Sequence, residues 1–153
     1  MAAYFCDTSA LVKRYVAETG SVWLTATIAP QAGNYVFVAR ITFVEVISAI
    51  ARRERGKHIS PNDAKTAQNQ FETDYSSEFF NVEISENLIN VAANLAKKYA
   101  LRGYDAVQLA AALETEKERI TLGLSPLTLL SADTDLNAAA VSEGLTVDNP
   151  NNH

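Results

Sequence analysis

The sequence alternates short apolar runs with longer stretches of helical periodicity, and this alternation limits the folds open to it more than any other feature. The runs of strand length are Ala3–Cys6, Tyr35–Ala39, Phe79–Ile84, Leu127–Leu130 and a shorter edge segment, Leu145–Val147. The helical stretches are Leu11–Ala17, Ser21–Ile28, Thr42 to near Gly56, Ser60–Ser77, Ser85–Tyr99, Tyr104–Lys117 and Asn137–Ser142. Strands that alternate with helices form a parallel sheet covered on both faces. We therefore expect a three-layer α/β/α sandwich with a mostly parallel central sheet.

The chain has 153 residues, and this length fits one domain with its own core. We assign residues 1–148 to that domain and residues 149–153 to a polar, frayed tail. No apolar run approaches the ~20 residues needed to span a bilayer, and the N-terminus lacks the pattern of a signal peptide. Cys6 is the only cysteine, so no internal disulfide forms, and the expected location is the reducing cytoplasm.

The chain carries a net charge of −5 and has a pI of about 5.0. Proteins that hold nucleic acid on a broad basic surface are cationic. The charge therefore argues against a large electrostatic footprint on DNA. It leaves open a compact site in which bound metal ions supply the positive charge.

Four carboxylates stand where strands end or where helices begin. Asp7 and Asp133 follow the first and fourth strands, and Glu45 and Asp105 lie in the first turns of two helices. In a parallel sheet, the carboxyl ends of the strands and the starts of the following helices lie at one edge. We therefore expect the four side chains to converge there, with Asp135 as a fifth candidate.

The competing interpretation is that each acid only complements a helix dipole, which favours Asp and Glu in first turns. The apolar neighbours of Glu45 and Asp105 favour a functional role instead, because unpaired charges beside a core need a cation or must be protonated, and a divalent metal is the natural partner. Oxygen ligands suit Mg²⁺ or Mn²⁺, whereas zinc sites prefer Cys and His. The two histidines, His58 and His153, are expected at the surface, away from the acids.

Four segments occur in an order that resembles the PIN-domain ribonucleases, especially the VapC-type toxins of toxin–antitoxin systems. They are D-T-S-A-L-V-K (7–13), F-V-E-V-I-S-A (43–49), R-G-Y-D-A-V-Q-L-A-A-A-L (102–113) and L-L-S-A-D-T-D-L (129–136). The resemblance implies a PIN-like fold, an Mg²⁺- or Mn²⁺-dependent endoribonuclease activity, an RNA substrate, a homodimer and a cognate antitoxin. It also implies metal-binding acids at Asp7, Glu45, Asp105 and Asp133, and a site-ordering hydroxyl at Ser9. The stretch 114–126 is long for the family, which leaves the shape of the rim near Asp133 open.

The basic residues Arg52, Arg53, Arg55 and Lys57 are candidate contacts for RNA phosphates. Their alternative role is a solvated helix end whose cations complement the dipole.

A catalytically silent PIN-like module that binds RNA or protein is the alternative to an enzyme. Other enzyme classes fit less well. A receiver domain needs an acidic pair near the first strand and a lysine after the last one, a D-x-D phosphatase needs an acid where Ser9 stands, and no phosphate-binding Walker loop is present.

Overall fold

The core of the protein is a five-stranded, wholly parallel sheet with the strand order β3-β2-β1-β4-β5. The computed structural model describes residues 1–153. The strands are β1 (Ala3–Cys6), β2 (Tyr35–Ala39), β3 (Phe80–Val82), β4 (Thr128–Leu130) and β5 (Thr146–Asp148). The predicted α/β/α sandwich is confirmed, and the central strands lie within one residue of their predicted bounds.

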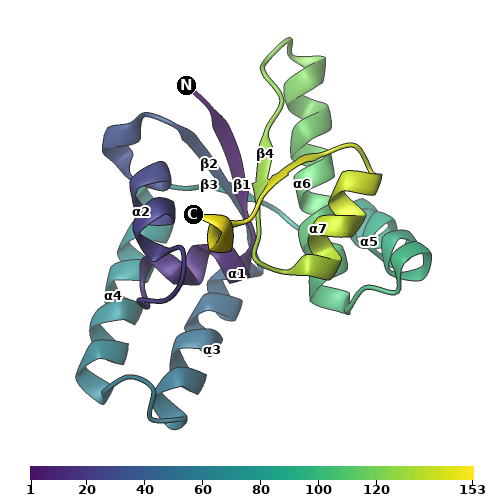
Figure 1. Cartoon of the computed structure of the whole chain (residues 1–153). Coiled ribbons are helices and arrows are strands. Elements are labelled where there is room, and N and C mark those ends of the chain that lie inside the picture. Colours follow the sequence, from purple (N-terminus) through teal and green to yellow (C-terminus); the bar gives the residue numbers. More distant parts are fainter.

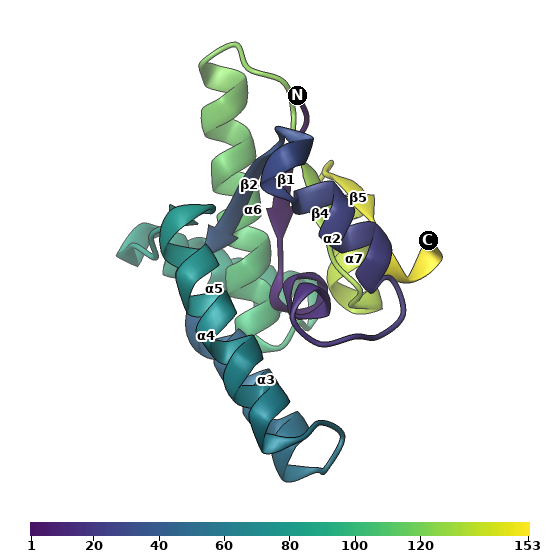
Figure 2. The ribbon, with the colours of Figure 1, turned by 90° about the vertical axis from the view of Figure 1, so that its left-hand side faces the viewer.

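Seven helices cover the two faces of this sheet (Figure 1). On one face lie α1 (Thr8–Leu11), α2 (Ser21–Ile28), α3 (Thr42–Arg55) and α4 (Pro61–Ser77), with short 3-10 turns at Val12–Arg14 and Pro30–Ala32. On the other face lie α5 (Glu86–Tyr99), α6 (Gly103–Thr121) and α7 (Thr134–Ser142). The α3–α4 hairpin extends beyond the end of the sheet (Figure 2). None of these helices has both the length and the apolar character needed to cross a membrane.

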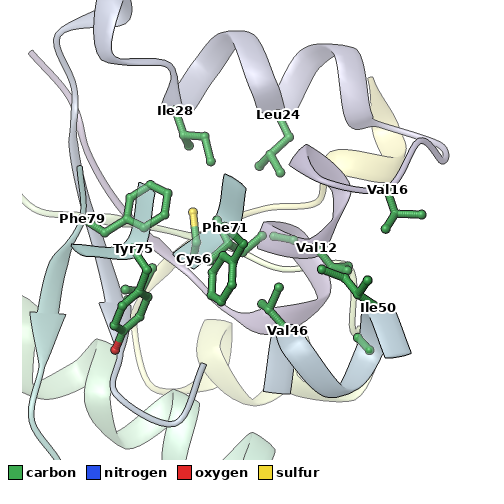
Figure 3. Packing of buried hydrophobic residues seen from close by; sticks show 14 of the residues in the cluster. Cys6, Val12, Val16, Leu24, Ile28, Val46, Ile50, Phe71, Tyr75 and Phe79 are labelled. Atoms are coloured by element: carbon green, nitrogen blue, oxygen red, sulfur yellow. The ribbon is translucent and has the colours of Figure 1, made fainter. Parts of the chain in front are cut away.

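Successive residues of β1 point to opposite faces of the sheet and so belong to two separate cores. Phe5 packs into the cluster under α5, α6 and α7, and Cys6 packs into the cluster under α1 to α4. Figure 3 shows Cys6 surrounded by apolar side chains, including Leu24, Ile28 and Phe71. This burial raises the pKa of the Cys6 thiol, so the residue behaves as a small apolar side chain.

Several helices begin earlier, or end later, than the sequence pattern predicts. The first helix begins at Thr8 instead of Leu11 and is over by Arg14, because Asp7 caps it by accepting a hydrogen bond from the Ala10 amide. In the same way α7 begins at Thr134, directly after its cap Asp133. At its other end α6 runs to Thr121, so the unusually long stretch 114–126 is mostly helix.

The C-terminal tail is ordered, and the expectation of a frayed tail is wrong. Residues Pro150–Asn152 form a 3-10 turn in which Pro150 is buried. The ring of His153 stacks on Trp23 of α2, with 3.8 Å between ring centroids. These contacts join the end of the chain to α2. The polar composition of residues 149–153 could not predict them, because they depend on a distant segment of the chain.

Substitution of Gly20 tests the packing of the tail. The backbone at Gly20 has φ +85°, and a Cβ added there would lie 2.3 Å from the carbonyl oxygen of Pro150. Gly123 has a similar φ of +74° but faces open space, so it is a matched control for backbone strain alone. We expect Gly123→Ala to lower the free energy of unfolding by about 1 kcal/mol, and Gly20→Ala to lower it clearly more. Urea unfolding measures both, and equal losses would mean that the tail does not pack on Gly20.

Candidate active site

All four predicted carboxylates line one pocket of about 340 Å³ at the carboxyl end of the parallel sheet, the lower end in Figure 1. Asp7 and Glu45 come from α1 and α3 on one face of the sheet. Asp105 and Asp133 come from the starts of α6 and α7 on the other face. The pocket therefore lies where the two helical layers meet.

Asp7 is the most buried of the four acids, with 3% of its surface exposed. Its Oδ1 accepts hydrogen bonds from the Ser9 hydroxyl at 2.8 Å and the Ala10 amide at 3.0 Å, and its Oδ2 accepts one from the Ser131 hydroxyl at 3.1 Å. Burial raises the pKa of Asp7 to about 7; these hydrogen bonds oppose the rise, and the nearby charge of Asp105 adds to it. The carboxylate is thus held in place by hydrogen bonds but has no cation of its own.

Two serine hydroxyls connect Asp7 to the loop that carries Asp133. Ser9 Oγ accepts from the Ala132 amide at 2.9 Å, and Ser131 Oγ accepts from the Asp133 amide at 3.1 Å. Each hydroxyl also donates to Asp7, so the ends of β1 and β4 are cross-linked through one carboxylate. The sequence analysis named Ser9 and missed Ser131, although Ser131 follows β4 directly as Asp7 follows β1.

Glu45 is held by neutral donors. Its Oε1 accepts from the Thr8 hydroxyl at 3.0 Å and from the Gln108 amide nitrogen at 2.9 Å. Gln108, only 2% exposed, also donates to the Thr42 hydroxyl at 2.9 Å. The sequence analysis missed Gln108, whose signal is a polar side chain within the Ala- and Leu-rich part of α6. Thr42 is the first residue of α3 and does not cap it, because Ile41 holds the cap position; the Thr42 hydroxyl accepts the hydrogen bond from Gln108 instead.

Asp105 and Asp133 face one another across the guanidinium of Arg102. Arg102 Nε lies 3.5 Å from Asp105 Oδ2, and its Nη2 lies 3.6 Å from Asp133 Oδ2. Partial burial raises the pKa of Asp105, and the charges of Asp133 and Glu45 add to this; Arg102 opposes them without reversing the direction. Asp133 combines two roles, because its Oδ1 also caps α7 through the Leu136 amide at 2.9 Å.

The predicted basic residues divide into two pairs. Arg52 and Arg53 line the acidic pocket, whereas Arg55 and Lys57 line a separate groove at the α3–α4 turn. Arg53 is partly engaged, since it pairs with Glu18 at 3.0 Å.

The remaining candidates lie outside the acidic pocket. Asp135 is exposed and lines a neighbouring pocket. Both histidines are exposed and lie away from the four acids: His58 lines the groove at the α3–α4 turn, and His153 stacks on Trp23.

The donor set of the pocket fits a hard divalent cation that brings its own water ligands. No three His, Cys, Asp or Glu side chains stand close enough together to form a ready-made metal cage. Mg²⁺ does not require one, because it keeps several waters and takes one or two carboxylates plus substrate phosphate. The buried Asp7 and the facing pair Asp105 and Asp133 provide oxygen ligands of this kind, with negative charge in excess of the local cations.

The fold and the site together define a class of protein: a parallel α/β/α sandwich with an acid-lined pocket at the carboxyl ends of its strands. A model of the PIN domain matches residues 4–141, and the chain belongs to the PIN domain family. The resemblance seen in the sequence motifs is thereby confirmed.

Known proteins share this fold. Ribonuclease VapC45 of Mycobacterium tuberculosis (strain CDC 1551 / Oshkosh) is 32% identical over 113 residues, which cover 74% of this chain and 76% of that protein. The crystal structure of FitAcB from Neisseria gonorrhoeae superimposes with a TM-score of 0.63 at 16% identity and covers 96% of this chain and 97% of that one. A toxin–antitoxin complex from Klebsiella pneumoniae gives a TM-score of 0.60 at 21% identity, with 98% of each chain covered.

The raised pKa of Asp7 makes stability depend on pH. Between about pH 4 and pH 7 the folded chain binds more protons at this carboxyl than the unfolded chain, so its contribution to stability is lost as pH rises through this window. In EDTA at pH 8, we expect the free energy of unfolding of Asp7→Asn to be about 2 kcal/mol higher than that of the wild type. At pH 4 we expect the difference between the two proteins to be smaller. Urea unfolding at both pH values measures this. The exposed Asp135→Asn variant is the control, and a wild type that matches Asp7→Asn at pH 8 would contradict the assignment.

Proposed function

We propose that this chain is a metal-dependent endoribonuclease that hydrolyses RNA phosphodiester bonds and acts as the toxin of a toxin–antitoxin pair. The observation that carries the proposal is the meeting of Asp7, Glu45, Asp105 and Asp133 in one pocket. Membership of the PIN domain family and 32% identity to a protein named a ribonuclease support it.

The proposed cofactor is Mg²⁺ or Mn²⁺, and its candidate ligands are Asp7, Glu45, Asp105 and Asp133. One or two of these carboxylates would hold an ion, and water and a substrate phosphate would fill its other positions. When bound, such an ion stabilises charge on a phosphodiester and lowers the pKa of water. The chain's own residues prepare the site. Ser9 and Ser131 fix both oxygens of Asp7, and Gln108 and Thr8 orient Glu45. Their directional hydrogen bonds hold four like charges in place before any substrate arrives.

We assign the RNA contact at the rim to Arg52, with Arg53 beside it. Arg52 is exposed, lines the pocket and forms no ion pair with an acidic side chain, so it is free to meet a phosphate. Arg55 and Lys57 face another groove, and we no longer group them with this contact.

The proposed partners are a cognate antitoxin and a second copy of the chain, and the proposed location is the cytoplasm. The similarity in fold to a toxin–antitoxin complex from Klebsiella pneumoniae supports an antitoxin partner. The homodimer and the location rest on the family resemblance and on the use of a single, buried cysteine.

Cleavage of a labelled single-stranded RNA in Mn²⁺ tests the activity. We expect Asp7→Asn and Asp105→Asn each to lower kcat/KM by about 100-fold or more, because each removes a ligand charge from the transition state. Asp135→Asn, outside the pocket, is the matched control and is expected to keep full activity. A wild type that binds RNA or antitoxin but shows no metal-dependent turnover would favour the silent binding module instead.

RNA binding tests the assignment of the basic residues. We expect Arg52→Ala to weaken RNA binding about threefold to tenfold and to reduce the slope of log K against log salt by about 0.7, the value for one contact with a single-stranded phosphate. Lys57→Ala removes an equal charge from the other groove and is expected to change neither quantity. Fluorescence anisotropy over a salt series measures both, and equal effects of the two variants would reject the assignment.

A further inference from the structure

Among the basic residues, only Arg102 forms ion pairs with members of the acidic cluster, namely Asp105 and Asp133. Its position is unusual. It occupies the N-cap position of α6, the end of a long helix at which the dipole favours anions and disfavours cations. Its side chain makes no capping hydrogen bond and is 85% exposed. Neither the stability of the helix nor burial explains an arginine here.

The contacts of Arg102 are loose. Both N–O distances, 3.5 Å to Asp105 and 3.6 Å to Asp133, exceed those of good hydrogen bonds, and no hydrogen bond fixes the guanidinium. Exposed ion pairs of this kind contribute little to stability. A stronger cation can therefore displace the guanidinium at little cost.

The two oxygens that Arg102 contacts belong to acids that we assign to the metal. A dication held by these carboxylates would compete with the guanidinium, because Arg102 already contacts Asp105 Oδ2 and Asp133 Oδ2. Asp105 and Asp133 are like charges that share one counter-ion, so they need a cation in either state. Arg102 supplies this positive charge as long as no metal does.

Arg102 also has room to move. It lines the acidic pocket and a neighbouring pocket of about 410 Å³, and only Asp105 shares this double position. Once released from the acids, the guanidinium stands at the boundary between the two pockets. A planar guanidinium is well suited to pair with a phosphate through two hydrogen bonds.

We propose that Arg102 is an exchangeable counter-ion: it neutralises Asp105 and Asp133 in the metal-free protein, yields its place to the divalent cation, and then binds a phosphate of the RNA. The proposal rests on the ribonuclease function proposed above and makes Arg102 a substrate-binding residue in it. It requires that loss of Arg102 changes metal affinity and RNA affinity in opposite directions.

Calorimetry and RNA binding on the full chain test this requirement. Titration with Mn²⁺ alone is expected to show about threefold to tenfold tighter binding to Arg102→Ala than to the wild type, because the competing cation is gone. A fluorescein-labelled 2′-O-methyl RNA in Ca²⁺, with its integrity checked on a gel, is expected to bind the same variant about threefold to tenfold more weakly. Arg102→Lys, which keeps the charge, is expected to restore most of the RNA affinity. Arg55→Ala, in the distant groove, is the matched control and is expected to shift neither affinity.

Three outcomes overturn the proposal, and a fourth separates it from the ribonuclease function. Weaker binding of both Mn²⁺ and RNA by Arg102→Ala would mean that Arg102 only supports the structure of the pocket, and unchanged affinities would mean that it has no role. If the wild type binds no Mn²⁺, the metal site and the exchange fail together. Opposite shifts in a chain that cleaves no RNA would support the exchange while rejecting the ribonuclease.

Discussion

The burial of one carboxylate organises the functional end of this molecule. Asp7 follows β1, caps α1 and accepts hydrogen bonds from Ser9 in α1 and from Ser131 at the end of β4. An ionised carboxylate in such a place is costly unless donors and cations compensate. The chain itself supplies the hydrogen-bond donors to Asp7, but no cation pairs with this carboxylate. The pocket is therefore suited to a positively charged ligand. The burial that makes the ionised carboxylate of Asp7 costly at neutral pH also leaves it without a cation of its own, and this supports the proposal of a metal site.

Glu45 and Asp133 are also fixed by hydrogen bonds, although they are less buried than Asp7. Glu45 is fixed by hydrogen bonds from the neutral donors Gln108 and Thr8 and forms no ion pair with a basic side chain. Asp133 caps α7 through one oxygen and presents the other to the pocket. Helix capping and a place in the pocket are therefore not alternatives here, because Asp7 and Asp133 combine both. An interpretation based on the helix dipole alone accounts for their position at helix starts but not for their convergence in one pocket.

Local pattern predicted the order of the elements and the positions of the acids because both depend on short-range periodicity. The ranges of α2 and β2 match their predicted bounds residue for residue. The contacts that local pattern could not predict join distant segments: Gln108 with Glu45, Ser131 with Asp7, and His153 with Trp23. A short polar tail looks frayed by composition, and only the surface of α2 reveals where it packs. The division of the four basic residues likewise depends on where α3 leaves the pocket.

The four acids come in two pairs, one from each helical layer, and a single ligand that engaged both pairs would act as a clasp across the sheet. Its binding energy would oppose the separation of α1 and α3 from α6 and α7, whose cores are otherwise independent. With the ligand bound, amide groups in both layers would gain protection against hydrogen exchange together. Without the ligand, each layer would be able to open separately.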